Sequence, residues 1–147
     1  MKEILIKDII RECNASLIIG DENLKIENFS KDTREINEND CYIGIKGETF
    51  DGNLFYEEAF KKGASACILE KESVKDIDFK NYNNKTIIIV DNSIKFLQEL
   101  AAYKRSLYDI PVIAVTGSVG KTSTKEIISS VLSTKYNVLK TEGNYNN

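Results

Sequence analysis

The chain has 147 residues, of which 41% are hydrophobic and only one is proline, so it should fold as one ordinary domain or two small ones. Its formal net charge of -3, from 20 basic and 23 acidic residues, excludes a general electrostatic attraction to nucleic acid or to an anionic membrane. Histidine is absent, which excludes Ser–His and Cys–His catalysis in this stretch, and three separated cysteines suggest neither a zinc cluster nor a disulfide framework.

The first eight residues carry charges where a signal peptide needs an apolar run. No stretch approaches the about 20 apolar residues that a membrane span requires. We therefore expect a cytoplasmic protein that binds neither membrane nor nucleic acid.

The first part of the chain alternates short helix and strand patterns. Helices are predicted at residues 7–13 and 54–62, and strands at 25–29, 41–45 and 66–69. Each pattern is short, and no repeat or low-complexity tract separates them. This order predicts a small α/β domain.

The polar run at residues 81–85 is rich in turn-forming residues and offers little to bury. It predicts a domain boundary, with a first domain at 1–82 and a second at 83–147. The second domain opens with the β-branched run 86–90, which is typical of a strand buried on both faces. The apolar stripe that follows predicts a helix to about Tyr108.

A glycine-containing loop pattern, Thr-Gly-Ser-Val-Gly-Lys-Thr, occupies residues 116–122 between a predicted strand at 112–116 and a predicted helix at 121–134. Gly117 and Gly120 allow a sharp turn and a close approach of the backbone N–H groups to an anion. The N-terminus of the following helix adds partial positive charge at the same place. The pattern predicts a phosphate-binding loop.

Two side chains of this loop have the chemistry that a bound nucleoside triphosphate needs. Lys121 can reach a β- or γ-phosphate as a point charge, and the Thr122 hydroxyl can ligate the accompanying magnesium ion. The longer form of the motif has glycine where this chain has Val115, so the loop is a shortened form. The motif identifies a ligand but leaves the reaction open.

A last short strand is predicted at residues 137–140, which completes a β-α-β-α-β order for the second domain. This order is typical of a doubly wound parallel sheet with its ligand at the carboxyl ends of the strands. Such a sheet needs more strands than this chain supplies. We therefore expect an α/β protein in which a P-loop parallel-sheet domain is only begun, as the N-terminal piece of a longer chain.

Four segments resemble the Mur ligase family. Residues 116–126 and 139–147, the latter ending in Gly-Asn-Tyr-Asn-Asn, are similar to the family's short phosphate loop and its Gly-Asn-x-Asn-Asn segment. Residues 30–34, Ser-Lys-Asp-Thr-Arg, are similar to its Asp-Ser-Arg segment. Residues 45–53 are similar to its Gly-x-x-x-Asp-Gly-His segment, with Asn53 in place of the histidine.

The resemblance implies an ATP-dependent amide ligase of peptidoglycan precursor synthesis. In this reaction ATP phosphorylates the terminal carboxylate of UDP-N-acetylmuramoyl-tripeptide, and the amine of D-alanyl-D-alanine attacks the acyl phosphate. The implied cofactors are ATP and Mg²⁺. The implied domains are a UDP-muramyl-peptide-binding domain at 1–82 and the first part of a central ATP-binding domain at 83–147.

The resemblance also implies the site residues. The phosphates and Mg²⁺ would be bound by the loop, with Lys121 as the catalytic residue and Thr122 as the metal ligand: Gly117, Ser118, Val119, Gly120, Lys121, Thr122 and Ser123. The uridine and diphosphate of the substrate would be bound in the first domain: Ser30, Thr33, Arg34, Lys46, Phe50, Asp51 and Gly52. Alone, the 147 residues are expected to be catalytically inactive and prone to self-association through uncovered apolar faces.

Other interpretations stay open at this point. Residues 30–34 and 50–52 are also compatible with plain turns, and Asn144, Asn146 and Asn147 with a loop that merely turns. One alternative is the sister ligase that adds the third amino acid, which shares the first-domain segments but generally carries Thr-Asn within its loop. Another is a folate polyglutamate ligase, which lacks a UDP-binding domain. A non-catalytic nucleotide-binding module is a further alternative.

Overall fold

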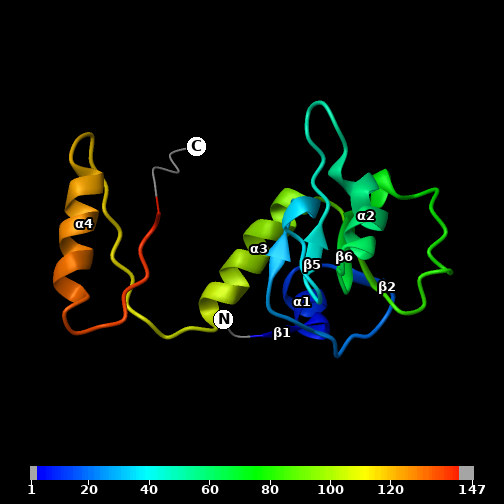
Figure 1. Ribbon diagram of the computed structural model, residues 1–147, viewed down its shortest axis with the longest axis horizontal. Helices are drawn as coiled ribbons and strands as arrows, with labels where there is room; N and C mark the ends of the chain where they lie inside the picture. Colours follow the sequence, from blue (N-terminus) through cyan, green and yellow to red (C-terminus); the bar gives the residue numbers. More distant parts are fainter. Residues whose placement is uncertain (1–2, 143–147) are drawn as a thin grey trace. The chain divides into compact units, whose positions relative to one another are not determined.

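The computed structural model describes residues 3–142, which form two compact units that divide between Tyr108 and Asp109 (Figure 1). The first unit contains every strand found in the described residues, and the second contains one α-helix. Among the described residues, no helix is long and apolar enough to cross a bilayer.

A five-stranded sheet forms the centre of the first unit. Its strands are, in spatial order, β2 (Ser16–Ile19), β7 (Thr86–Val90), β6 (Ala66–Glu70), β5 (Cys41–Ile43) and β4 (Phe29–Ser30). All neighbours pair in parallel except β2, which is antiparallel to β7. A separate antiparallel pair joins β1 (Ile4–Leu5) to β3 (Lys25–Ile26). The predicted α/β class is therefore confirmed, but the mostly parallel sheet is built from residues 16–90 and not from residues 83–147, where it was predicted.

Alternation along the strands builds an apolar layer on each face of this sheet. On β6, Ile68 packs in one layer while Cys67 and Leu69 pack in the other, because successive strand side chains point to opposite faces. Each strand of the centre is thus buried on both faces, as expected for parallel strands.

Helices cover both layers (Figure 1). Helices α1 (Ile6–Glu12) and α3 (Ser93–Ser106) contribute Ile6, Ile9, Phe96 and Leu100 to the first layer. Helix α2 (Tyr56–Lys61) contributes Tyr56 and Phe60 to the second layer, where their rings meet those of Phe79 and Tyr82. Short 3₁₀ turns connect these elements: η1 (Thr33–Glu35), η2 (Gly52–Phe55) and η3 (Lys71–Ser73).

The boundary predicted near residue 82 is wrong. The run 81–85 is a connection inside the first unit, because β7 follows it and pairs with β6 on one side and β2 on the other. Helix α3 then packs on the same sheet. The polar composition of 81–85 indicated a loop correctly, but a loop at the surface need not separate domains.

The second unit consists, in the described residues, of α4 (Lys121–Leu132) and the segments that flank it. The predicted strands at 112–116 and 137–140 are not formed, and Val112 and Ile113 are largely exposed. A strand needs the backbone of a neighbouring strand to pair its N–H and C=O groups, and the described part of this unit offers none. The β-branched residues 112–116 therefore form no sheet within the described residues.

Candidate active site

The carboxyl ends of four parallel strands of the first unit meet at one edge of the sheet, because β4, β5, β6 and β7 run in the same direction. The two segments with predicted substrate contacts leave the sheet at this edge. Residues 31–34 follow β4, which ends at Ser30, and residues 44–53 follow β5. Binding sites of open α/β sheets lie at the carboxyl ends of their strands, so the topology supports these predictions without testing them.

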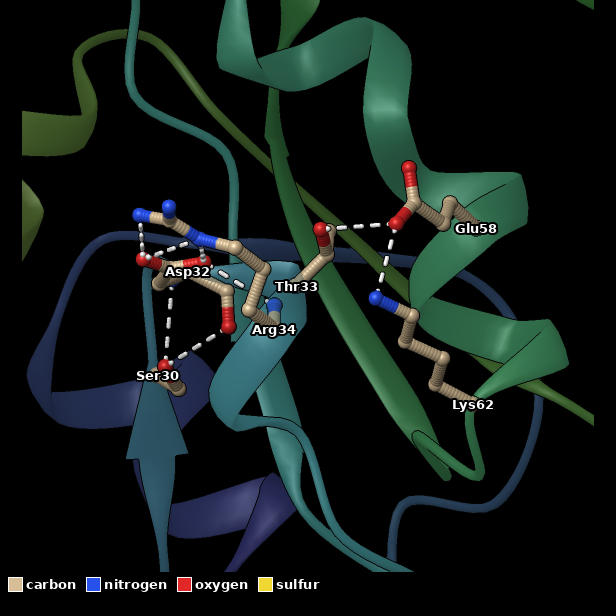
Figure 2. A network of polar contacts seen from close by, with 6 residues as sticks. All are labelled: Ser30, Asp32, Thr33, Arg34, Glu58 and Lys62. Carbon is tan, nitrogen blue, oxygen red and sulfur yellow. Dashed lines mark hydrogen bonds and ion pairs between the residues drawn. The ribbon is translucent and has the colours of Figure 1, made fainter.

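A compact turn places Arg34 after β4 (Figure 2). The Ser30 Oγ accepts a hydrogen bond from the Asp32 backbone N–H at 3.1 Å. The Asp32 carboxylate accepts from the backbone N–H of Arg34 at 2.9 Å, and from its Nε and Nη2 at 2.9 and 2.6 Å. Asp32 therefore both caps the 3₁₀ turn and holds the guanidinium, although the Arg34 side chain is 83% exposed.

Thr33 is engaged differently from its neighbour. Its hydroxyl donates to Glu58 Oε1 on α2 at 3.1 Å, and Lys62 forms an ion pair with the same carboxylate at 2.9 Å. Figure 2 shows the Arg34 side chain turned toward Asp32 and the Thr33 side chain turned toward Glu58. The structure thus brings Ser30 and Arg34 together around Asp32 but directs Thr33 to α2.

Asp32 supplies a pH-dependent test of this geometry. Hydrogen bonds from the Arg34 side chain and backbone lower the pKa of Asp32 from 3.8 to about 2. Since the folded-state pKa lies below the unfolded one, the pair stabilises the fold above about pH 4, and this contribution is lost as the pH falls toward about 2. Arg34→Ala is expected to raise the pKa of Asp32 toward 3.8, as measured by a carboxyl-carbon NMR titration.

The matched control for this titration is Arg11→Ala, which removes another largely exposed guanidinium, on α1, and its ion pair with Asp8. It should leave the pKa of Asp32 unchanged. An Asp32 that titrates near 3.8 in the unmutated protein would show that the pair does not persist in solution.

The segment after β5 forms a tight turn at residues 46–51. Lys46 and Asp51 pair as an isolated antiparallel bridge, and the Gly47 N–H donates to the Phe50 carbonyl at 2.9 Å. Lys46 is exposed, and the Phe50 ring is 63% exposed. Gly52, at the base of the turn, must be glycine, since a Cβ there would lie 2.5 Å from the Ile45 carbonyl oxygen.

The predicted phosphate loop of the second unit, residues 116–122, leads directly into α4. Gly117 and Gly120 have φ angles of +151° and +81°. Residues other than glycine rarely adopt these backbone conformations. The Lys121 Nζ donates to the Gly117 carbonyl at 2.6 Å, so the ammonium group lies over the loop. Ser118, Val119, Thr122 and Ser123, in the loop and the first turn of α4, are exposed to solvent.

Three side chains that hold the turns of the first unit were not predicted from the sequence. Asp32 lies inside the segment 30–34, and its spacing to Arg34 could have indicated a pair. Glu58, which accepts from Thr33, and Ser73, whose Oγ donates to the Asp51 carboxylate at 2.6 Å, gave no signal, because they reach the turns from distant parts of the chain. The asparagine-rich segment with Asn144, Asn146 and Asn147 lies outside the described residues.

An exposed glycine-containing loop at a helix N-terminus, together with an α/β unit whose polar turns follow the carboxyl ends of parallel strands, is typical of α/β proteins that bind phosphate-containing ligands. The chain belongs to the Mur ligase family. The model described as "Mur ligase family, catalytic domain" matches residues 25–105, and the model described as "Mur ligase middle domain" matches 115–147. The gap between the two matches contains the division at Tyr108.

Individual relatives agree with this assignment. The chain is 37% identical over 144 residues to a UDP-N-acetylmuramoyl-tripeptide–D-alanyl-D-alanine ligase of Synechocystis. This match covers 97% of this chain and 30% of the relative. The structure of a UDP-N-acetylmuramoylalanyl-D-glutamyl-2,6-diaminopimelate–D-alanyl-D-alanyl ligase from Acinetobacter baumannii matches with a TM-score of 0.82 at 27% identity, over 98% of this chain and 31% of that chain.

A MurF ligase from Thermotoga maritima, solved in complex with ADP, is 37% identical and has a TM-score of 0.66. The match covers 82% of this chain and 26% of that chain. The chain therefore spans less than a third of the length of the relatives it matches.

Proposed function

We propose that this chain works within an ATP-dependent ligase that joins D-alanyl-D-alanine to UDP-N-acetylmuramoyl-tripeptide. The observation that carries the proposal is the exposed phosphate loop, with Lys121 lying over it at the start of α4. Family membership and the relatives' names support the same reaction. In this reaction the tripeptide carboxylate attacks the γ-phosphorus and ADP leaves; the amine then attacks the acyl carbon, loses a proton, and phosphate leaves.

The loop binds the phosphates of ATP through backbone N–H groups between Gly117 and Lys121 and through the positive end of α4. The Lys121 ammonium, released from the Gly117 carbonyl, stabilises the negative charge on the transferring phosphoryl group. The ADP complex of the Thermotoga maritima relative supports nucleotide binding.

Thr122 fits a magnesium ion that accompanies the nucleotide. It directly follows Lys121 in the exposed first turn of α4, and a hydroxyl oxygen is the type of ligand that this ion takes. When bound, Mg²⁺ neutralises charge on the phosphate oxygens.

The first unit binds the UDP-muramyl peptide at the carboxyl edge of its sheet. Arg34 and Lys46 contact the diphosphate, because both cations are exposed at turns that follow neighbouring strands. Ser30 sets the turn of Arg34, and Phe50 offers an exposed ring in the same turn as Lys46. Three expectations stay predictions: a cytoplasmic location, the inactivity of the isolated 147 residues, and their self-association.

A ligation assay with the full-length protein tests the proposal. Phosphate release should require ATP, UDP-N-acetylmuramoyl-tripeptide and D-alanyl-D-alanine together. Arg34→Ala should raise the KM for the UDP substrate by about tenfold, because a charge-assisted hydrogen bond contributes about 1.5 kcal/mol or more. The KM for ATP should stay the same, since the nucleotide binds through the other unit.

Arg11→Ala is again the matched control, because it removes a similarly exposed arginine from α1. Equal losses for ATP and the UDP substrate in Arg34→Ala would point to a folding defect and contradict the assignment of Arg34. Absence of ligation with all three substrates would contradict the proposed function itself.

A further inference from the structure

The Asp51 carboxylate is occupied by hydrogen-bond donors from the protein itself. Its Oδ1 accepts from the backbone N–H and the Nδ2 of Asn53 at 2.9 and 2.7 Å, and its Oδ2 accepts from the Ser73 Oγ at 2.6 Å. Burial raises the pKa of Asp51, but the bonds from Ser73 and Asn53 outweigh it, and the pKa lies below its ordinary value. The carboxylate is therefore charged at neutral pH and turned into the protein.

Asn53 fixes this group to the end of the sheet. The residue is fully buried, and its Oδ1 accepts from the Glu70 backbone N–H at the end of β6 at 2.8 Å. It also packs against the end of β5, where a Cβ on Gly44 would lie 2.6 Å from the Asn53 Oδ1. A shift of the Asn53 side chain is thus opposed by the backbone of two strands.

Ser73 closes the network from another part of the chain. It belongs to η3, which directly follows β6, and it lies 22 residues after Asp51. Its Oγ also accepts from the Asn53 Nδ2 at 3.4 Å. Asp51 is therefore held from two directions, by η2 and by η3.

The position of Asp51 determines where the exposed turn of residues 46–51 lies. Lys46 pairs with Asp51 through the backbone, and the Gly47–Phe50 hydrogen bond closes the turn beyond this pair. The side chain of Asp51 thus points inward to the network, while its backbone holds the two ends of the turn that carries Lys46 and Phe50. A looser Asp51 would let the turn move relative to Arg34.

We infer that Ser73 and Asn53 are positioning residues that hold Asp51, and that Asp51 orients the 46–51 turn for the nucleoside diphosphate of the substrate without contacting it. The inference rests on the proposed function. It also reassigns Asp51, which the sequence analysis placed among the substrate contacts. Preorganisation of the turn lowers the ordering cost that binding must overcome.

Ser73→Ala in the full-length protein removes one donor at a half-exposed site and spares the buried Asn53. We expect the KM for UDP-N-acetylmuramoyl-tripeptide to rise about three- to tenfold, which is the range for losing part of a hydrogen bond to a charged group. The kcat should not change, because the turn contributes equally to binding of the ground state and of the transition state. The KM for ATP should not change either, because the nucleotide binds through the other unit. Ser73→Thr keeps a hydroxyl and should restore most of the affinity.

The matched control is Ser65→Ala, at the opposite end of β6. Ser65 is likewise half-buried, and its Oγ donates to the Asn39 carbonyl at 3.1 Å. It should lower thermal stability about as much as Ser73→Ala but leave the KM for the UDP substrate unchanged. An equal KM rise in both variants would show a general stability effect and overturn the inference.

A double-mutant cycle separates positioning from contact. If Asp51 acts only through the turn, then Asp51→Asn and Ser73→Ala should be non-additive, and the double variant should bind the UDP substrate about as weakly as Asp51→Asn alone. Additive losses would show that Asp51 contacts the substrate independently of Ser73 and would overturn the inference. An unmutated protein that does not saturate with UDP-N-acetylmuramoyl-tripeptide would instead overturn the proposed function.

Discussion

Lys121→Ala is expected to lower the kcat of the full-length ligase by about 10²-fold or more, since removal of one preorganised charge at a developing oxyanion has that effect in other enzymes. The ammonium lies over the phosphate loop, 2.6 Å from the Gly117 carbonyl oxygen. It is exposed, so its loss should not unfold α4. Phosphate release under saturating substrates measures the change, and circular dichroism verifies the fold.

Lys125→Ala is the matched control for this variant. Lys125 lies one turn further along α4, and its Nζ donates to the Thr141 carbonyl at 2.7 Å and not to the loop. Its removal should leave the kcat within a few-fold of the unmutated value. Near-normal turnover of Lys121→Ala would remove Lys121 from the mechanism, whereas equal losses in both variants would indicate a disturbed helix.

The sequence predicted the elements that depend on local pattern. The helix from about residue 94 was visible because its apolar stripe is long and Asn92 caps it, accepting from the Lys95 N–H at 2.8 Å. The loop at 117–120 was visible because glycine and lysine are required by its chemistry. Both features are encoded within a few neighbouring residues.

Features that depend on distant partners could not be predicted in the same way. Strand β2 has only four residues, which alternate between exposed and partly buried, and it lies at the edge of the sheet with β7 as its one partner there. The run 112–116 has strong β propensity, yet it forms no strand, because propensity cannot supply a neighbouring strand. Ser73 meets Asp51 only because η3 and η2 lie at the same end of the sheet.

The second large expected effect is a loss of stability when the chain is cut at the boundary predicted near residue 82. Cutting the chain after Tyr82 would remove β7 and α3, which supply Ile87, Ile88, Val90, Phe96 and Leu100 to the core. Each such side chain contributes about 1.5–3 kcal/mol on burial, and the total stability of a small domain is only about 5–15 kcal/mol. Strand β2 would also lose its only partner in the sheet.

A chain of residues 1–82 is therefore expected to be unfolded, whereas residues 1–108 should fold on their own. The longer chain keeps all five strands and the helices on both faces, and its two apolar layers draw no residue from the second unit. Dispersed amide signals in a ¹H–¹⁵N NMR spectrum and a cooperative thermal transition should be seen for 1–108 alone. If 1–82 also folds cooperatively, β7 is dispensable, and the boundary predicted from the polar run at 81–85 would stand after all.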